Sequence, residues 1–149
     1  MAVRAVVPTN SALIRGKLTM WNNALKNWEN RMKDAVRIIF IHYVRFTSMP
    51  GDKIRVSEYA VHAFIHALKD ITNSIKRLNE QKEFYTIFNE HSQQEHSHDL
   101  LCDNCSFFQS GAERFIAISE SCAKSVDKTA TDFQHIVTVN LEWLAIQPK

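Results

Sequence analysis

Apolar residues recur with a helical period along the first third of the chain. After Pro8 they fall at Ile14, Leu18, Trp21, Leu25, Trp28, Met32, Ala35 and Ile39. This regular alternation of four-residue and three-residue steps predicts one long amphipathic helix with a heptad stripe. Met49-Pro50-Gly51 ends the pattern, because the residue before proline resists the α conformation and glycine turns the chain. We therefore expect a helix from just after Pro8 to just before Met49.

The end of this first helix is more broadly apolar. Between residues 38 and 46 the apolar positions are Ile38, Ile39, Phe40, Ile41, Tyr43, Val44 and Phe46. They occupy more than one helix face, which predicts burial on more than one side. A wide apolar face around Phe40 is also consistent with a dimer.

Two further helices are predicted. Ser57 is a candidate N-cap for a second helix over residues 57–89, with apolar residues at Val61, Phe64, Leu68, Ile71, Ile75 and Leu78. Lys82 interrupts this stripe, and Tyr85 and Phe88 resume it. A third helix is expected from Ser106, with its stripe at Cys122, Val126, Ala130, Phe133, Val137, Leu141 and Leu144. On this stripe Cys122 is expected to be an inert core thiol.

These elements predict a single all-α domain over residues 1–149. Short connections favour an antiparallel bundle of three long helices, with a tail at 1–9 and a polar connection at 90–105. A kinked helix or a dimer would give four helices in cross-section. The sequence holds only three Gly and three Pro, too few turn-forming residues for a β-sandwich or barrel. It also lacks the long apolar run of a membrane span, so no membrane partner is expected.

The polar connection carries one set of residues with metal-binding chemistry: His96-x-His98-x3-Cys102-x2-Cys105. Two thiolates and two imidazoles form a tetrahedral ligand set for Zn²⁺, and four protein ligands leave no open position for catalysis. We therefore expect a structural zinc, which would offset the ordering entropy of a polar connection. His91 is a spare ligand. The alternatives are a thioredoxin-like dithiol, which lacks the expected βαβ context, and a surface cluster without metal.

The same segment resembles a His-x-His…Cys-x-x-Cys motif of uncharacterised animal proteins encoded by mobile elements. In that family a helix follows the cysteines and carries an Asp-Phe…Ile…Trp signature, which Asp132-Phe133, Ile136 and Trp143 match here. The resemblance covers about residues 85–145, and the chain departs from it in lacking a further Cys just before His96. It implies a zinc-stapled helical module within a larger element-encoded protein, and it supplies no catalytic residues.

Charge is unevenly distributed along the chain. Residues 1–51 carry eight basic and two acidic side chains, whereas the remainder sums to −4. The basic residues of the first helix that are candidates for phosphate binding are Arg15, Lys17, Lys26, Arg31, Lys33 and Arg37. They spread around the helix instead of forming one stripe. Packing of a basic helix beside acidic ones therefore competes with a nucleic-acid-binding function.

The other residue patterns favour no catalytic function. His62 and His66 share a helix face and are interpreted as rim histidines, and a di-iron site would need Glu-x-x-His motifs of which only Glu95-x-x-His98 fits. Three cysteines without a signal peptide predict an intracellular protein, cytoplasmic or nuclear. We therefore expect a non-enzymatic interaction or oligomerisation module that binds a protein partner or itself. The alternatives are nucleic-acid binding through the basic helix and, less favoured, a metal or redox enzyme.

Overall fold

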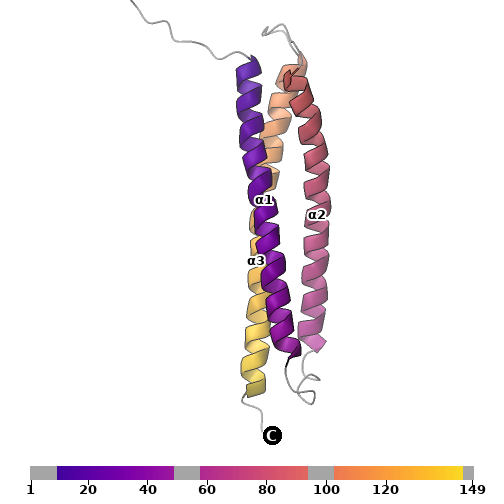
Figure 1. The fold of residues 1–149 in the computed structure, drawn as a ribbon, viewed down its shortest axis with the longest axis vertical. Helices are drawn as coiled ribbons and strands as arrows, with labels where there is room; N and C mark the ends of the chain where they lie inside the picture. The colour runs from indigo at the N-terminus through magenta and orange to yellow at the C-terminus, as the bar shows by residue number, and fades with distance from the viewer. Residues whose placement is uncertain (1–9, 49–57, 94–102, 146–149) are drawn as a thin grey trace, which may run out of the picture.

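The computed structural model describes residues 10–48, 58–93 and 103–145, which form three α-helices (Figure 1). The helices are α1 (Asn10–Thr47), α2 (Glu58–Gln93) and α3 (Asp103–Ala145). Successive helices run in opposite directions, so α1 and α3 are parallel and α2 is antiparallel to both (Figure 1). The described residues contain no β-strand. The prediction of an all-α bundle of three long helices is confirmed.

The heptad stripe of α1 faces the interior of the bundle, as predicted. All eight stripe residues are buried, and the indoles of Trp21 and Trp28 are fully enclosed. The expectation that the end of this helix would be buried on several sides is wrong for Phe40, Ile41 and Val44, each about half exposed. In a three-helix bundle only two neighbours cover α1, so its outer face stays open at this end.

The buried stripe of α2 differs from the predicted one. It runs through Ala60, Ala67, Ile71, Ser74, Leu78, Gln81 and Phe88. Ile75, predicted to be in the core, is exposed, and the polar Ser74 and Gln81 are buried. The physical reason is hydrogen bonding, because the buried indoles of α1 need acceptors. Gln81, not Lys82, continues the heptad, so the stripe has no interruption.

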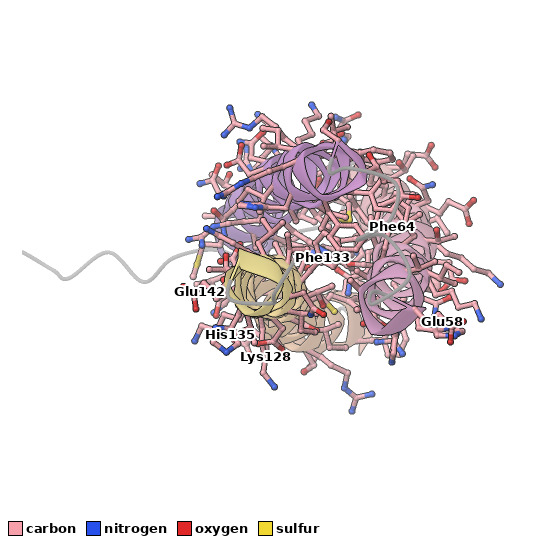
Figure 2. All side chains as sticks on the ribbon, turned by 90° about the horizontal axis from the view of Figure 1, so that it is seen from below. Glu58, Phe64, Lys128, Phe133, His135 and Glu142 are labelled. Carbon is pink, nitrogen blue, oxygen red and sulfur yellow. The ribbon has the colours of Figure 1, made fainter. Side chains whose placement is uncertain are left out.

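The stripe of α3 is also a heptad rather than the predicted eleven-residue pattern. Its buried positions are Ala112, Ile116, Ser119, Ala123, Val126, Ala130, Phe133 and Val137. Ala123 takes the core position, and Cys122 is half-buried beside it. The thiol therefore packs against the core from its edge, so its assignment to the core itself is wrong. Viewed along the bundle, Phe64 and Phe133 point inward, whereas Lys128 and His135 point outward (Figure 2).

Polar contacts at regular intervals fix the relative positions of the helices. The Trp28 indole N–H donates to Ser74 Oγ at 2.8 Å, and that of Trp21 donates to Gln81 Oε1 at 3.2 Å. The two pairs are one heptad apart on both helices. Between α1 and α3, Lys17 pairs with Glu113, and Arg31 pairs with Asp127 fourteen residues further along both helices. The buried pairs Trp28–Ser74 and Trp21–Gln81 select one register of α1 against α2 among several apolar alternatives.

The connection between α2 and α3 is shorter than the predicted 90–105. Residues 90–93 belong to α2 and residues 103–105 belong to α3, which leaves nine residues between the helices. The apolar contact of the His91 ring with Phe108 explains why α2 continues, with ring centroids 4.1 Å apart. The predicted cap Ser57 and the tail 1–9 lie outside the described residues.

The two glycines within the helices should respond oppositely to alanine. Gly16→Ala should stabilise the protein by up to about 1 kcal/mol, because nothing lies within 4 Å of the added Cβ and alanine has the higher helix propensity. At Gly111 the Cβ would lie 3.0 Å from the Phe88 ring, which is buried. Overpacking there should outweigh the propensity gain and cost about 1 kcal/mol net. Urea unfolding of both variants tests this, and equal stabilisation would contradict the close packing at Gly111.

Candidate functional site

The end of α2 and the beginning of α3 form a compact aromatic layer. His91 is buried against Phe108, and Phe88 meets Phe108 edge-on with ring centroids 4.4 Å apart. Trp21 of α1 stacks on Phe115, with centroids 5.1 Å apart. This layer lies at the end of the bundle where α2 ends and α3 begins.

Of the five candidate zinc ligands, the structure describes His91 in full and only the backbone of Cys105. His96, His98 and Cys102 lie outside the described residues. Cys105 lies in the first turn of α3, and of its side chain nothing is described. The spare ligand His91 sits in the aromatic layer just below the connection. Among the side chains that are described, no three from His, Cys, Asp and Glu are grouped to hold a metal ion.

The six basic candidates of α1 fall into two groups. Lys17 and Arg31 face α3, where Lys17 Nζ lies 2.9 Å from a carboxylate oxygen of Glu113, and Arg31 pairs with Asp127. This supports the interpretation that a basic helix packs beside an acidic one. The other four lie at spacings of 11, 7 and 4 residues, which place them on one exposed stripe of α1: Arg15, Lys26, Lys33 and Arg37. Because Lys17 and Arg31 lie on another face of α1, the six together form no single stripe, although these four do.

A groove between α2 and α3 contains the predicted rim histidines. His62, His66 and Asp70 of α2 face Asp132 of α3 across a groove of about 340 Å³. His66 Nδ1 lies 3.6 Å from Asp70 Oδ2. Both histidines are exposed, as their interpretation as rim residues requires. His135 points to the outer surface, away from the groove that Asp132 lines (Figure 2).

Nearer the α2–α3 connection, the same pair of helices carries an apolar surface. We call Phe84, Ile87, Phe107 and Ile118 the aromatic face; they lie on facing stripes of α2 and α3, and Phe107 is 68% exposed. The ring of Phe84 stacks on the half-buried Phe115 with centroids 5.2 Å apart. A hollow of about 270 Å³ beside the Phe115 ring is lined by Phe107 and Gly111, among other residues. Exposed large apolar side chains that lie near one another are a feature of interaction sites.

No protein-family model, curated protein or solved structure matches this chain. None of the helices in the described part of the chain is apolar enough over its length to cross a bilayer.

The buried polar residues Ser74, Gln81 and Ser119 were not predicted from the apolar pattern. A signal for Ser74 and Gln81 exists in the sequence, because positions 74, 78, 81, 85 and 88 continue one heptad when polar residues are allowed at its positions.

Proposed function

We propose that this chain is a non-enzymatic helical interaction module that binds another protein or a second copy of itself. The observation that carries the proposal is the aromatic face, where Phe84, Ile87 and Phe107 are 45%, 52% and 68% exposed. Burying such side chains on association is favourable, by up to about 1.5–3 kcal/mol for each one that becomes fully buried. The buried Ser74, Gln81 and Ser119 are hydrogen-bonded to other side chains, as expected of a structural scaffold.

A structural Zn²⁺ at the α2–α3 connection is part of this proposal. His96, His98, Cys102 and Cys105 would hold it and fix the two helices that carry the aromatic face. The resemblance to mobile-element-encoded proteins with the same motif is consistent with a module of this kind within a longer protein. The ligand set is full, so the metal would serve folding rather than catalysis.

Nucleic-acid binding remains the second candidate, carried by the exposed stripe of Lys26, Lys33 and Arg37. The support is weaker, because Lys17 and Arg31 are engaged with carboxylates of α3. Apolar association and phosphate binding differ in their salt dependence, which makes them separable by experiment.

Light scattering of the purified protein should show self-association that persists as salt is raised, because apolar burial is not screened. The double variant Phe84→Asp/Phe107→Asp should be monomeric at the same concentration while keeping its helical circular dichroism. A matched control is Lys124→Asp/Lys128→Asp on the exposed outer side of α3, which should associate as the wild type does. A monomeric wild type that binds oligonucleotides with affinity falling steeply in salt would contradict the proposal.

A further inference from the structure

A second unpartnered surface lies between α1 and α2, on the other side of α2 from the aromatic face. We call it the α1–α2 groove: a hollow of about 350 Å³ lined by Glu29, Met32, Lys33, Val36, Ile75, Leu78, Asn79 and Lys82. Its floor is apolar, formed by the buried Met32 and Leu78 together with Val36 and Ile75. Ile75 is 42% exposed although it lies beside the core.

The apolar surface continues beyond the groove along α1. Phe40 and Val44 follow Val36 at four-residue intervals, so all three lie on one helix face, and both are about half exposed. Phe40 touches Phe64 of α2 edge-on, with centroids 5.8 Å apart, which places this stripe on the side of α1 that faces α2. From Met32 to Val44 it extends about 18 Å, the length of roughly three turns of a docked helix.

The charges beside this apolar floor are positive. Lys26, Lys33 and Arg37 follow one another at spacings of seven and four residues along the exposed side of α1. Glu29 is the one acidic residue that lines the groove, and it is paired with Lys82 at 3.2 Å. Arg37 contacts Asp34 at 3.4 Å, whereas the described residues offer Lys26 and Lys33 no ion pair. The rim therefore carries two lysines, Lys26 and Lys33, that no carboxylate of the described residues neutralises.

We propose that the α1–α2 groove binds an amphipathic α-helix of another protein whose apolar stripe is flanked by aspartate and glutamate. The apolar floor accepts side chains at successive helical turns, which is the mode of helix-in-groove recognition. The cationic rim supplies electrostatic complementarity to an acidic helix. This inference rests on the proposed function and names the class of partner.

Two other occupants fit the same observations less well. A second copy joined by a twofold axis would present an identical positively charged surface to this one, so the rims would repel. The phosphates of a nucleic acid would pair with the lysines of the rim. They would leave the apolar floor of the groove exposed, because phosphate contacts are made by the cationic side chains. Both serve as outcomes of the test.

The test uses two labelled helical peptides, which share one apolar stripe and differ in carrying either Asp/Glu or Lys/Arg at the flanking positions. Fluorescence anisotropy with the full chain should show binding of the acidic peptide and little binding of the basic one. Ile75→Asp should lower the affinity for the acidic peptide about tenfold or more, as expected for a residue at the centre of an interface. Lys26→Glu/Lys33→Glu should weaken it similarly and should confer binding of the basic peptide.

The matched control is Ile87→Asp, at an exposed isoleucine of α2 on the aromatic face, which should leave the affinity unchanged. Circular dichroism and melting confirm that each variant is folded. Loss of binding in Ile87→Asp but not Ile75→Asp would overturn the groove and leave the proposed function standing. Equal binding of both peptides would also overturn the proposed groove. So would displacement of the acidic peptide by an oligonucleotide whose own binding is weakened by Lys26→Glu/Lys33→Glu and not by Ile75→Asp. Failure to bind either peptide, in a protein that is monomeric, would count against both proposals.

Discussion

Trp28→Ala is expected to cost about 3–5 kcal/mol of folding free energy, one of the two largest effects predicted for this chain. The indole is fully enclosed, and its N–H donates to Ser74 Oγ at 2.8 Å. Alanine would leave a cavity where α1 meets α2 and would remove the hydrogen-bond partner of a buried hydroxyl. Urea or thermal unfolding monitored by circular dichroism measures the loss.

Two further substitutions separate the causes of that loss. Trp28→Phe keeps most of the buried area but removes the donor to Ser74, so it should cost less, about 1–3 kcal/mol. Met20→Ala removes a large apolar side chain of the same helix that is 53% exposed, and it should change stability by about 0.5 kcal/mol or less. A loss below about 1 kcal/mol for Trp28→Ala would mean that the indole is not enclosed as described.

Loss of the proposed zinc ion is expected to be the second large effect. Cys102→Ser or Cys105→Ser should release the metal and lower the stability by about 3 kcal/mol, with a fall in Tm of about 10 °C. The physical reason is that the nine residues between α2 and α3 form a polar connection whose ordering costs about 1–2 kcal/mol per residue. Coordination at the N-terminus of α3 would offset that cost.

Elemental analysis of the purified protein should give one zinc per chain in the wild type and none in either variant. Cys122→Ser is the matched control, because this half-buried thiol packs against the core and lies outside the proposed ligand set; it should retain the metal. A strong chelator should reproduce the fall in Tm of the wild type and have no effect on Cys102→Ser. Unchanged melting of the wild type with chelator would refute the structural role of zinc.

The aromatic face and the α1–α2 groove lie on opposite sides of α2, so the two proposals can be tested independently in one protein. Helix α2 joins the bundle through polar anchors at Ser74 and Gln81, between which the buried Leu78 packs. Ile75 is exposed in the α1–α2 groove, and Ile87 is exposed on the aromatic face. The same substitution at these two isoleucines therefore distinguishes the two surfaces.

The number, order and approximate ends of the helices follow from the sequence alone, as does the buried stripe of α1. Helical periodicity is a local property: Trp21 and Trp28 fall one heptad apart whatever surrounds them. The Met49-Pro50-Gly51 sequence likewise predicts the end of the first helix from backbone sterics alone. The His-x-His and Cys-x-x-Cys spacing likewise predicts a zinc ligand set without knowledge of the fold, and that ligand set stays a prediction.

Only the tertiary structure decided which face of α2 is buried and which basic residues are engaged. Ile75 is more apolar than Ser74 or Gln81, yet it lies outside the core because the two indoles of α1 require acceptors at those positions. Likewise Lys17 and Lys33 lie on different faces of α1, and the packing of the helices decided that Lys17 meets Glu113 of α3 whereas Lys33 borders a groove. The free energy of burying a side chain depends on its neighbour across the interface, and that neighbour is set by the packing of helices distant in sequence.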